Sequence, residues 1–116
     1  MEYIAVKPHR TEYPDPITVT AGEEIIPGEK SDENGNWPGW VFCTKLDGSN
    51  AGWLPAQIIR REGNTAAAAE DYSAAELNVD PGEILRGTRI LNGWVWAEKK
   101  NAPGQGWVPL ENLEPA

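Results

Sequence analysis

The chain contains one 21-residue pattern twice, and this constrains its fold more than any other feature. Residues 39–59 read GWVFCTKLDGSNAGWLPAQII and residues 93–113 read GWVWAEKKNAPGQGWVPLENL, which align at an offset of 54 without a gap. A second block, ITVTAGEEI at 17–25, matches LNVDPGEIL at 77–85 at an offset of 60. Two matching blocks in the same order indicate an internal duplication. Seven positions of the longer pattern are identical in both copies: Gly39, Trp40, Val41, Lys45, Gly52, Trp53 and Pro55.

The duplication predicts two consecutive units. We place the first at residues 1–61 and the second at residues 66–116, with residues 62–65 as a short linker. The first copy carries six extra residues between Gly22 and Gly39, in the polar stretch KSDENGNWPG, which suits a loop. Each unit has about 55 residues, which is near the lower limit at which a single core supports a fold.

Turn signals indicate that both units are made of short strands. Asn92-Gly93 lies between EILRGTRIL and WVWAEKK and predicts a type I′ hairpin turn. Pro55 and Pro109 have no N–H to donate, so each is expected to end a strand, and the second to be followed by one 3₁₀ turn and a last short strand. We place Ala66–Ala69 on a strand. The sequence therefore predicts an all-β protein, with five short strands per unit curled into a small barrel.

Charge and composition exclude several classes of function. The net charge of −8 disfavours nucleic acid and anionic membrane surfaces as partners. No apolar run reaches the length of a membrane span, and the N-terminus does not read as a signal peptide, so we expect a cytoplasmic location. His9 and Cys43 are the only residues of their kinds and fall in different predicted elements. The sequence therefore indicates no catalytic pair, no metal site and no cofactor.

Several short motifs occur in the same order in both units. The second unit reads Ala-Ala-Glu-Asp-Tyr at 68–72, Pro-Gly-Glu at 81–83, Trp94, and Gly-Trp-Val-Pro at 106–109. The first reads Ala-Val-Lys-Pro-His at 5–9, Ala-Gly-Glu at 21–23, Trp40, and Gly-Trp-Leu-Pro at 52–55. This arrangement resembles the Src homology 3 (SH3) family, in its variant, prokaryotic-type form. The resemblance implies two SH3-like barrels in tandem.

The resemblance also implies a groove for an extended peptide, built from aromatic side chains and a proline. This chain has only some of the residues that form the groove in the family. At four positions where the family has a groove tyrosine, it has Lys7, Ile58, Glu70 and Asn112. The expected binding residues of the first unit are Trp40 and Pro55, with His9 and Tyr13 as further walls. Those of the second unit are Trp94, Pro109 and Tyr72, with Glu76 from an acidic cluster that also contains Glu70 and Asp71.

The sequence thus favours a non-catalytic module that binds a protein or an extended peptide, proline-rich or basic. Two alternatives stay open. In one, the grooves are buried between the two barrels and the protein is structural or self-associating. In the other, as in secreted bacterial relatives of the fold, the module recognises cell-wall glycans. The sequence specifies neither the partner nor the oligomeric state.

Overall fold

The computed structural model describes residues 1–35 and 37–116, and within this part the regular structure is β-strand and 3₁₀ helix only. The all-β prediction is confirmed. Two single-turn 3₁₀ helices are present, η1 (Ala56–Ile58) and η2 (Leu110–Asn112). The strands are β1 (Glu2–Ala5), β2 (Thr18–Val19), β3 (Glu24–Lys30), β4 (Trp40–Lys45), β5 (Ala51–Pro55), β6 (Ile59–Glu62), β7 (Thr65–Ala68), β8 (Tyr72–Ser73), β9 (Ile84–Leu91), β10 (Trp94–Lys99), β11 (Gln105–Pro109) and β12 (Leu113–Pro115).

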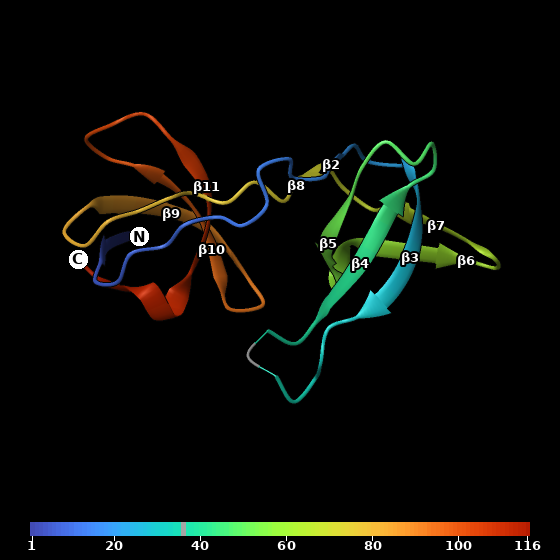
Figure 1. Ribbon diagram of the computed structural model, residues 1–116, viewed down its shortest axis with the longest axis horizontal. Helices are drawn as coiled ribbons and strands as arrows, with labels where there is room; N and C mark the ends of the chain where they lie inside the picture. The colour runs from blue at the N-terminus through green and yellow to red at the C-terminus, as the bar shows by residue number, and fades with distance from the viewer. Residues whose placement is uncertain (36) are drawn as a thin grey trace. The chain divides into compact units, whose positions relative to one another are not determined.

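The strands form three antiparallel sheets in two compact units (Figure 1). Unit 1 consists of Met1–Pro14 together with Ala75–Ala116 and holds a five-stranded sheet in the order β11-β10-β9-β1-β12. Unit 2 consists of Asp15–Ala74 and holds a sheet in the order β5-β4-β3-β7-β6, together with the two-stranded β2-β8. Neither five-stranded sheet is closed into a barrel by its hydrogen bonds, because the strands at the two ends of each order are not paired with each other.

This division differs from the contiguous boundaries 1–61 and 66–116. The first strand of the chain, β1, pairs with β9 and β12 of the second repeat, with Tyr3 opposite Leu85 and Ala5 opposite Leu113. Conversely, β7 of the second repeat pairs with β3 and β6 of the first, with Ala66 opposite Ile25. Each repeat therefore contributes its first strand to the unit that contains most of the other repeat.

The physical cause lies in the residues expected to form the linker. Glu62 pairs with Thr65, so only Gly63 and Asn64 connect β6 to β7. Two residues cannot carry the chain away from a sheet, but they close an antiparallel hairpin, and Gly63 at φ 60° suits the first position of such a turn. The hairpin keeps β7 beside β6.

The local predictions are confirmed. Asn92 at φ 48° and Gly93 at φ 86° form the turn between β9 and β10. Pro55 and Pro109 each end a strand and are followed directly by a 3₁₀ helix and a final strand. Three of the four alanines, Ala66, Ala67 and Ala68, lie on β7, and Ala69 follows it.

Each unit has its own core, and the strand from the other repeat contributes to it. In unit 1, Tyr3 and Ala5 of β1 are buried in one cluster with Leu85, Val95 and Val108. In unit 2, Ala66 and Ala68 of β7 are buried, as are residues of the neighbouring strands. No helix in the described part of the chain is long and apolar enough to cross a membrane.

Candidate functional site

The arm that follows β1 in unit 1 brings His9 into a fixed position. His9 pairs with Val79 through two backbone hydrogen bonds, His9 N–H to Val79 C=O (3.0 Å) and Val79 N–H to His9 C=O (3.1 Å). The Arg10 guanidinium donates to the carbonyls of both residues and forms an ion pair with Asp80. The Thr11 N–H donates to the side-chain oxygen of Asn78 (2.8 Å). The arm is therefore held against residues 78–80 over three consecutive positions.

His9 contacts two of the predicted binding residues. Its Nε2 lies 2.7 Å from Oε1 of Glu76, and both side chains are only 15% exposed. The His9 ring also contacts the Trp94 ring edge to face, with an angle of 78° between the ring planes and 5.5 Å between the ring centroids. Edge-to-face contacts of this kind stabilise the relative orientation of two rings. A titratable ring, a carboxylate and an indole are thus gathered at one place.

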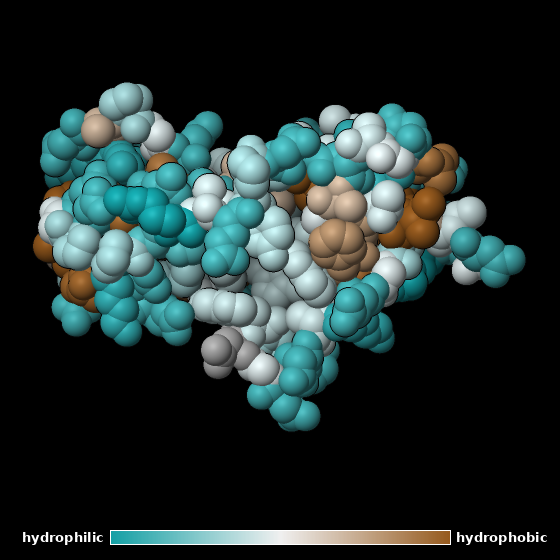
Figure 2. All heavy atoms as spheres, in the orientation of Figure 1, coloured by the Kyte–Doolittle hydropathy of each residue, from teal (hydrophilic) through white to brown (hydrophobic). Residues whose placement is uncertain are grey.

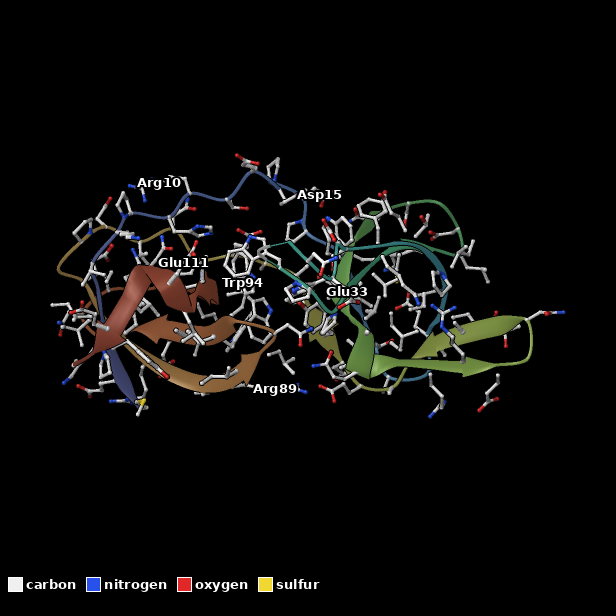
Figure 3. The ribbon with its side chains drawn as sticks, turned by 90° about the horizontal axis from the view of Figure 1, so that it is seen from below. Arg10, Asp15, Glu33, Arg89, Trp94 and Glu111 are labelled. Atoms are coloured by element: carbon white, nitrogen blue, oxygen red, sulfur yellow. The ribbon has the colours of Figure 1, made fainter. Side chains whose placement is uncertain are left out.

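Pro109 pairs with Trp94, and Asn112 holds the arm that carries His9. Pro109 is buried and lies opposite Trp94 in the β10–β11 ladder. Asn112, in η2, is 8% exposed; its side-chain nitrogen donates to the Pro8 carbonyl (3.0 Å) and its own carbonyl accepts the Val6 N–H (2.8 Å). Figure 3 labels Trp94 and also Glu111, the exposed residue next to Asn112.

Tyr13 lies further along the same arm and is 50% exposed. Its N–H donates to the Thr11 hydroxyl (3.0 Å), which orders the arm locally. Trp94 itself is partly buried, so unit 1 has one partly accessible aromatic side chain at the site and a more exposed one, Tyr13, on the arm.

The corresponding position of unit 2 is closed. Trp40 lies opposite Pro55, as Trp94 lies opposite Pro109, but Trp40 is only 8% exposed and Pro55 is fully buried. The Trp40 Nε1 is buried without a hydrogen-bond partner among the described residues. Tyr72 of β8 is 6% exposed and pairs with Val19. These aromatic side chains are core residues of their unit.

The structure therefore groups the predicted residues differently. We expected His9 beside Trp40 and Tyr72 beside Trp94; instead His9 contacts Trp94, and Tyr72 belongs to the unit of Trp40. The cause is that β1 pairs with β9 and β12, whereas β7 pairs with β3 and β6. His9 follows β1 and Tyr72 follows β7, so each residue enters the unit of the strand before it. The acidic cluster is also divided: Glu76 lies in unit 1, whereas Asp71 lies in unit 2 and accepts the Ala21 N–H (2.8 Å).

Sequence reasoning did not select Asn112 as a site residue, and it missed the His9–Glu76 pair. The two partners of that pair are 67 residues apart and lie in different repeats. Gly63-Asn64 between two strand-like stretches is the signal that could have revealed the pairing, because Gly-Asn is a hairpin dipeptide.

The described residues carry little reactive chemistry. Cys43 is completely buried in unit 2, and burial raises its pKa to about 11, so the thiolate is scarce at neutral pH. Within the described ranges, His, Cys, Asp and Glu side chains do not gather in any group of three suited to a metal ion. What the site around Trp94 can do is make aromatic, polar and charge contacts with a ligand.

No protein-family model, no curated protein and no solved structure matches this chain.

Proposed function

We propose that the protein is a non-catalytic, SH3-like module that binds an extended protein segment at the site around Trp94 in unit 1. The observation that carries the proposal is the position of His9, which contacts both Glu76 and Trp94, so that three separate segments of the chain meet at this residue. Converging polar and aromatic groups at a partly exposed position are typical of recognition sites.

The element order of unit 1 supports the SH3-like interpretation. With residues 15–74 set aside, the chain runs from β1 through the long paired arm to β9, β10, β11, η2 and β12. This is the order of motifs on which the family resemblance rests. The site residues lie on the arm, at the start of β10, at the end of β11 and in η2.

The chemistry of the site favours a ligand that contains proline next to lysine or arginine. A proline-rich segment is already extended, so it loses little conformational entropy when it docks on aromatic side chains. Acidic residues, Glu12, Glu76 and Glu111, belong to the same unit, whose net charge is −2. Charge complementarity then selects a basic residue in the ligand.

We assign no ligand to the corresponding position of unit 2. Trp40 and Tyr72 are buried there, so an incoming peptide would have to displace core residues. A cytoplasmic location belongs to the same proposal and rests on the sequence alone.

The proposal is tested by titrating the isotope-labelled protein with a short peptide that contains two prolines and an arginine. Amide shifts are expected at His9, Glu76 and Trp94. The Trp94→Ala variant should lose about 2 kcal/mol of binding free energy, or about 30-fold in Kd, because a central aromatic anchor is removed.

Two controls make the result specific. Ile90→Ala truncates an exposed apolar side chain of β9 in the same unit and should leave the affinity unchanged. A peptide in which alanines replace the prolines should bind much more weakly. If Trp94→Ala binds as tightly as the wild type, or if the shifts lie outside unit 1, the proposal is wrong.

A further inference from the structure

The outer face of the unit 2 sheet is apolar at positions where the corresponding face of unit 1 is charged. On unit 2, Ile26 of β3 lies opposite Thr44 of β4, and Thr44 lies opposite Ala51 of β5. At the same register of unit 1, Arg86 lies opposite Glu98, and Glu98 lies opposite Gln105. Arg86 and Glu98 also form an exposed ion pair at 3.8 Å. The same backbone position thus carries an ion pair in unit 1 and an uncharged pair, isoleucine with threonine, in unit 2.

Aromatic and aliphatic side chains extend this apolar face. Phe42 and Trp53 lie opposite each other on β4 and β5, their rings nearly perpendicular and their centroids 5.3 Å apart. Ile26 is 51% exposed, and Leu46, directly after β4, is 61% exposed. Lys100 occupies the position of Leu46 in the other repeat. We call Ile26, Phe42, Leu46 and Trp53 the β3–β5 face.

In Figure 2, hydrophobic side chains gather on the visible surface of unit 2, over the position that β3 and β4 occupy in Figure 1. A single exposed aliphatic residue is ordinary, but a cluster on one sheet face is typical of an interaction surface. The Phe42–Trp53 pair has an aromatic counterpart in unit 1, Trp96 and Trp107. The positions of Ile26 and Leu46, in contrast, carry Arg86 and Lys100 in unit 1, so folding does not require aliphatic residues there.

The charge of unit 2 indicates what kind of partner fits the face. Residues 15–74 contain four basic and ten acidic residues, a net charge of −6, whereas unit 1 has a net charge of −2. Two of the four basic residues are paired within the unit, Lys45 with Glu23 at 3.3 Å and Arg60 with Glu62 at 3.6 Å. Glu24 and Asp47, next to the β3–β5 face in sequence, are exposed carboxylates.

We infer that the β3–β5 face binds an amphipathic protein segment with aliphatic residues on one side and Lys or Arg flanking them. The apolar side of such a segment covers Ile26, Phe42 and Leu46, while its cations meet the acidic surroundings. A second copy of the protein is a less suitable partner, because each unit 2 has a net charge of −6 and the two would repel each other. An anionic membrane would be repelled by the same charge. This surface is separate from the site around Trp94.

The test uses the full chain and a synthetic helical peptide of leucine and lysine, about 15 residues long, so that a helix can form on binding. A peptide with glutamate in place of lysine is the matched control. Amide shifts from the lysine peptide are expected on β3, β4 and β5. The glutamate peptide should bind at least about tenfold more weakly, because its charges repel the surface.

The internal repeat supplies the variants. Ile26→Arg combined with Thr44→Glu copies the Arg86–Glu98 pair at the same register and should weaken binding of the lysine peptide at least about tenfold. Leu46→Lys copies Lys100 at an exposed position outside the strands, and so tests the face even if the double variant folds poorly. Arg86→Ile combined with Glu98→Thr should leave binding by unit 2 intact.

Three results would overturn the inference. One is equal binding of the lysine and glutamate peptides. Another is unchanged affinity in both the Ile26→Arg/Thr44→Glu and the Leu46→Lys variants. The third is concentration-dependent shifts on β3–β5 without peptide that disappear in those variants, which would make a second copy the occupant.

Discussion

At the scale of single residues, the repeated lysine has a clear structural reason. Lys99 Nζ lies 2.8 Å from a carboxylate oxygen of Glu83, and its counterpart Lys45 lies 3.3 Å from Glu23. Glu83 also accepts the Asp80 N–H (2.7 Å), as Glu23 accepts the N–H of Thr20 (3.2 Å). Each glutamate therefore closes the turn before a central strand and ties it to the next strand.

This geometry predicts a pH dependence of stability. The hydrogen bond from Lys99, followed by that from the Asp80 N–H, lowers the pKa of Glu83 below its ordinary value. A lowered pKa in the folded state means that Glu83 stabilises the fold above the pKa of the unfolded chain. This contribution is lost as the pH falls through the folded value. Because the pair is partly exposed, we expect about 1 kcal/mol or less at pH 7.

Urea unfolding of the wild type and of Glu83→Gln between pH 7 and pH 3 checks this prediction. The variant should be less stable at pH 7, and the difference should shrink as the pH falls below 4. A Lys99→Met variant should behave similarly, since it removes one partner of the same carboxylate. A constant difference between wild type and Glu83→Gln across this range would contradict the assignment.

At the scale of the elements, the two-residue turn at Gly63-Asn64 has the largest consequence. It joins β6 to β7, and β7 in turn pairs with β3, so this turn connects β6 to the rest of the sheet. Gly63 has φ 60°, a backbone conformation that other L-residues adopt at a cost. A Cβ added at Gly63 would meet no atom within 4 Å, so the cost of a substitution is confined to the backbone.

We therefore expect Gly63→Ala to lower the free energy of unfolding by about 1–2 kcal/mol. Asn64→Ala is the matched control, because Asn64 has no positive φ and should tolerate alanine with little change. Thermal or urea unfolding measures both variants. Equal stability of the two variants would show that the turn does not constrain the hairpin.

Most elements were predictable from local sequence, because turns and proline stops act within a few residues. Asn92-Gly93 set the hairpin between β9 and β10, and Pro109 set the end of β11. The candidate site was predictable only in part. Trp94, Pro109 and Glu76 were assigned to one unit as the structure has them, but the residue that contacts Trp94 is His9, which was assigned to the other unit.

At the scale of the whole molecule, unit 2 is one continuous segment of the sequence, and unit 1 is formed by the residues before and after it. The ends of unit 2 are paired with each other: Thr18 lies opposite Ser73, and the Ala74 N–H donates to the Ile17 carbonyl (2.9 Å). The sheet of unit 1 needs β1 from Met1–Pro14, because β1 lies between β9 and β12 and pairs with both.

This organisation predicts which fragments fold. Residues 15–74 contain every strand of their unit and should give a dispersed amide spectrum and a cooperative unfolding transition. Residues 66–116 lack β1, so β12 has no neighbouring strand, and this fragment should be largely unfolded. The two fragments have similar lengths, so size alone does not explain a difference. A folded 66–116 fragment and an unfolded 15–74 fragment would contradict the division.

Local chemistry was sufficient to specify the strands, the turns and the pairing of each tryptophan with its proline, because these depend on neighbours in the chain or on one hairpin. It did not specify which first strand enters which sheet. Tyr3 and Ala5 of β1, and Ala66 and Ala68 of β7, show the same alternation of buried residues, and backbone hydrogen bonds are the same for any strand. The folded chain settles the choice through the short β6–β7 turn, and this places His9 rather than Tyr72 beside Trp94.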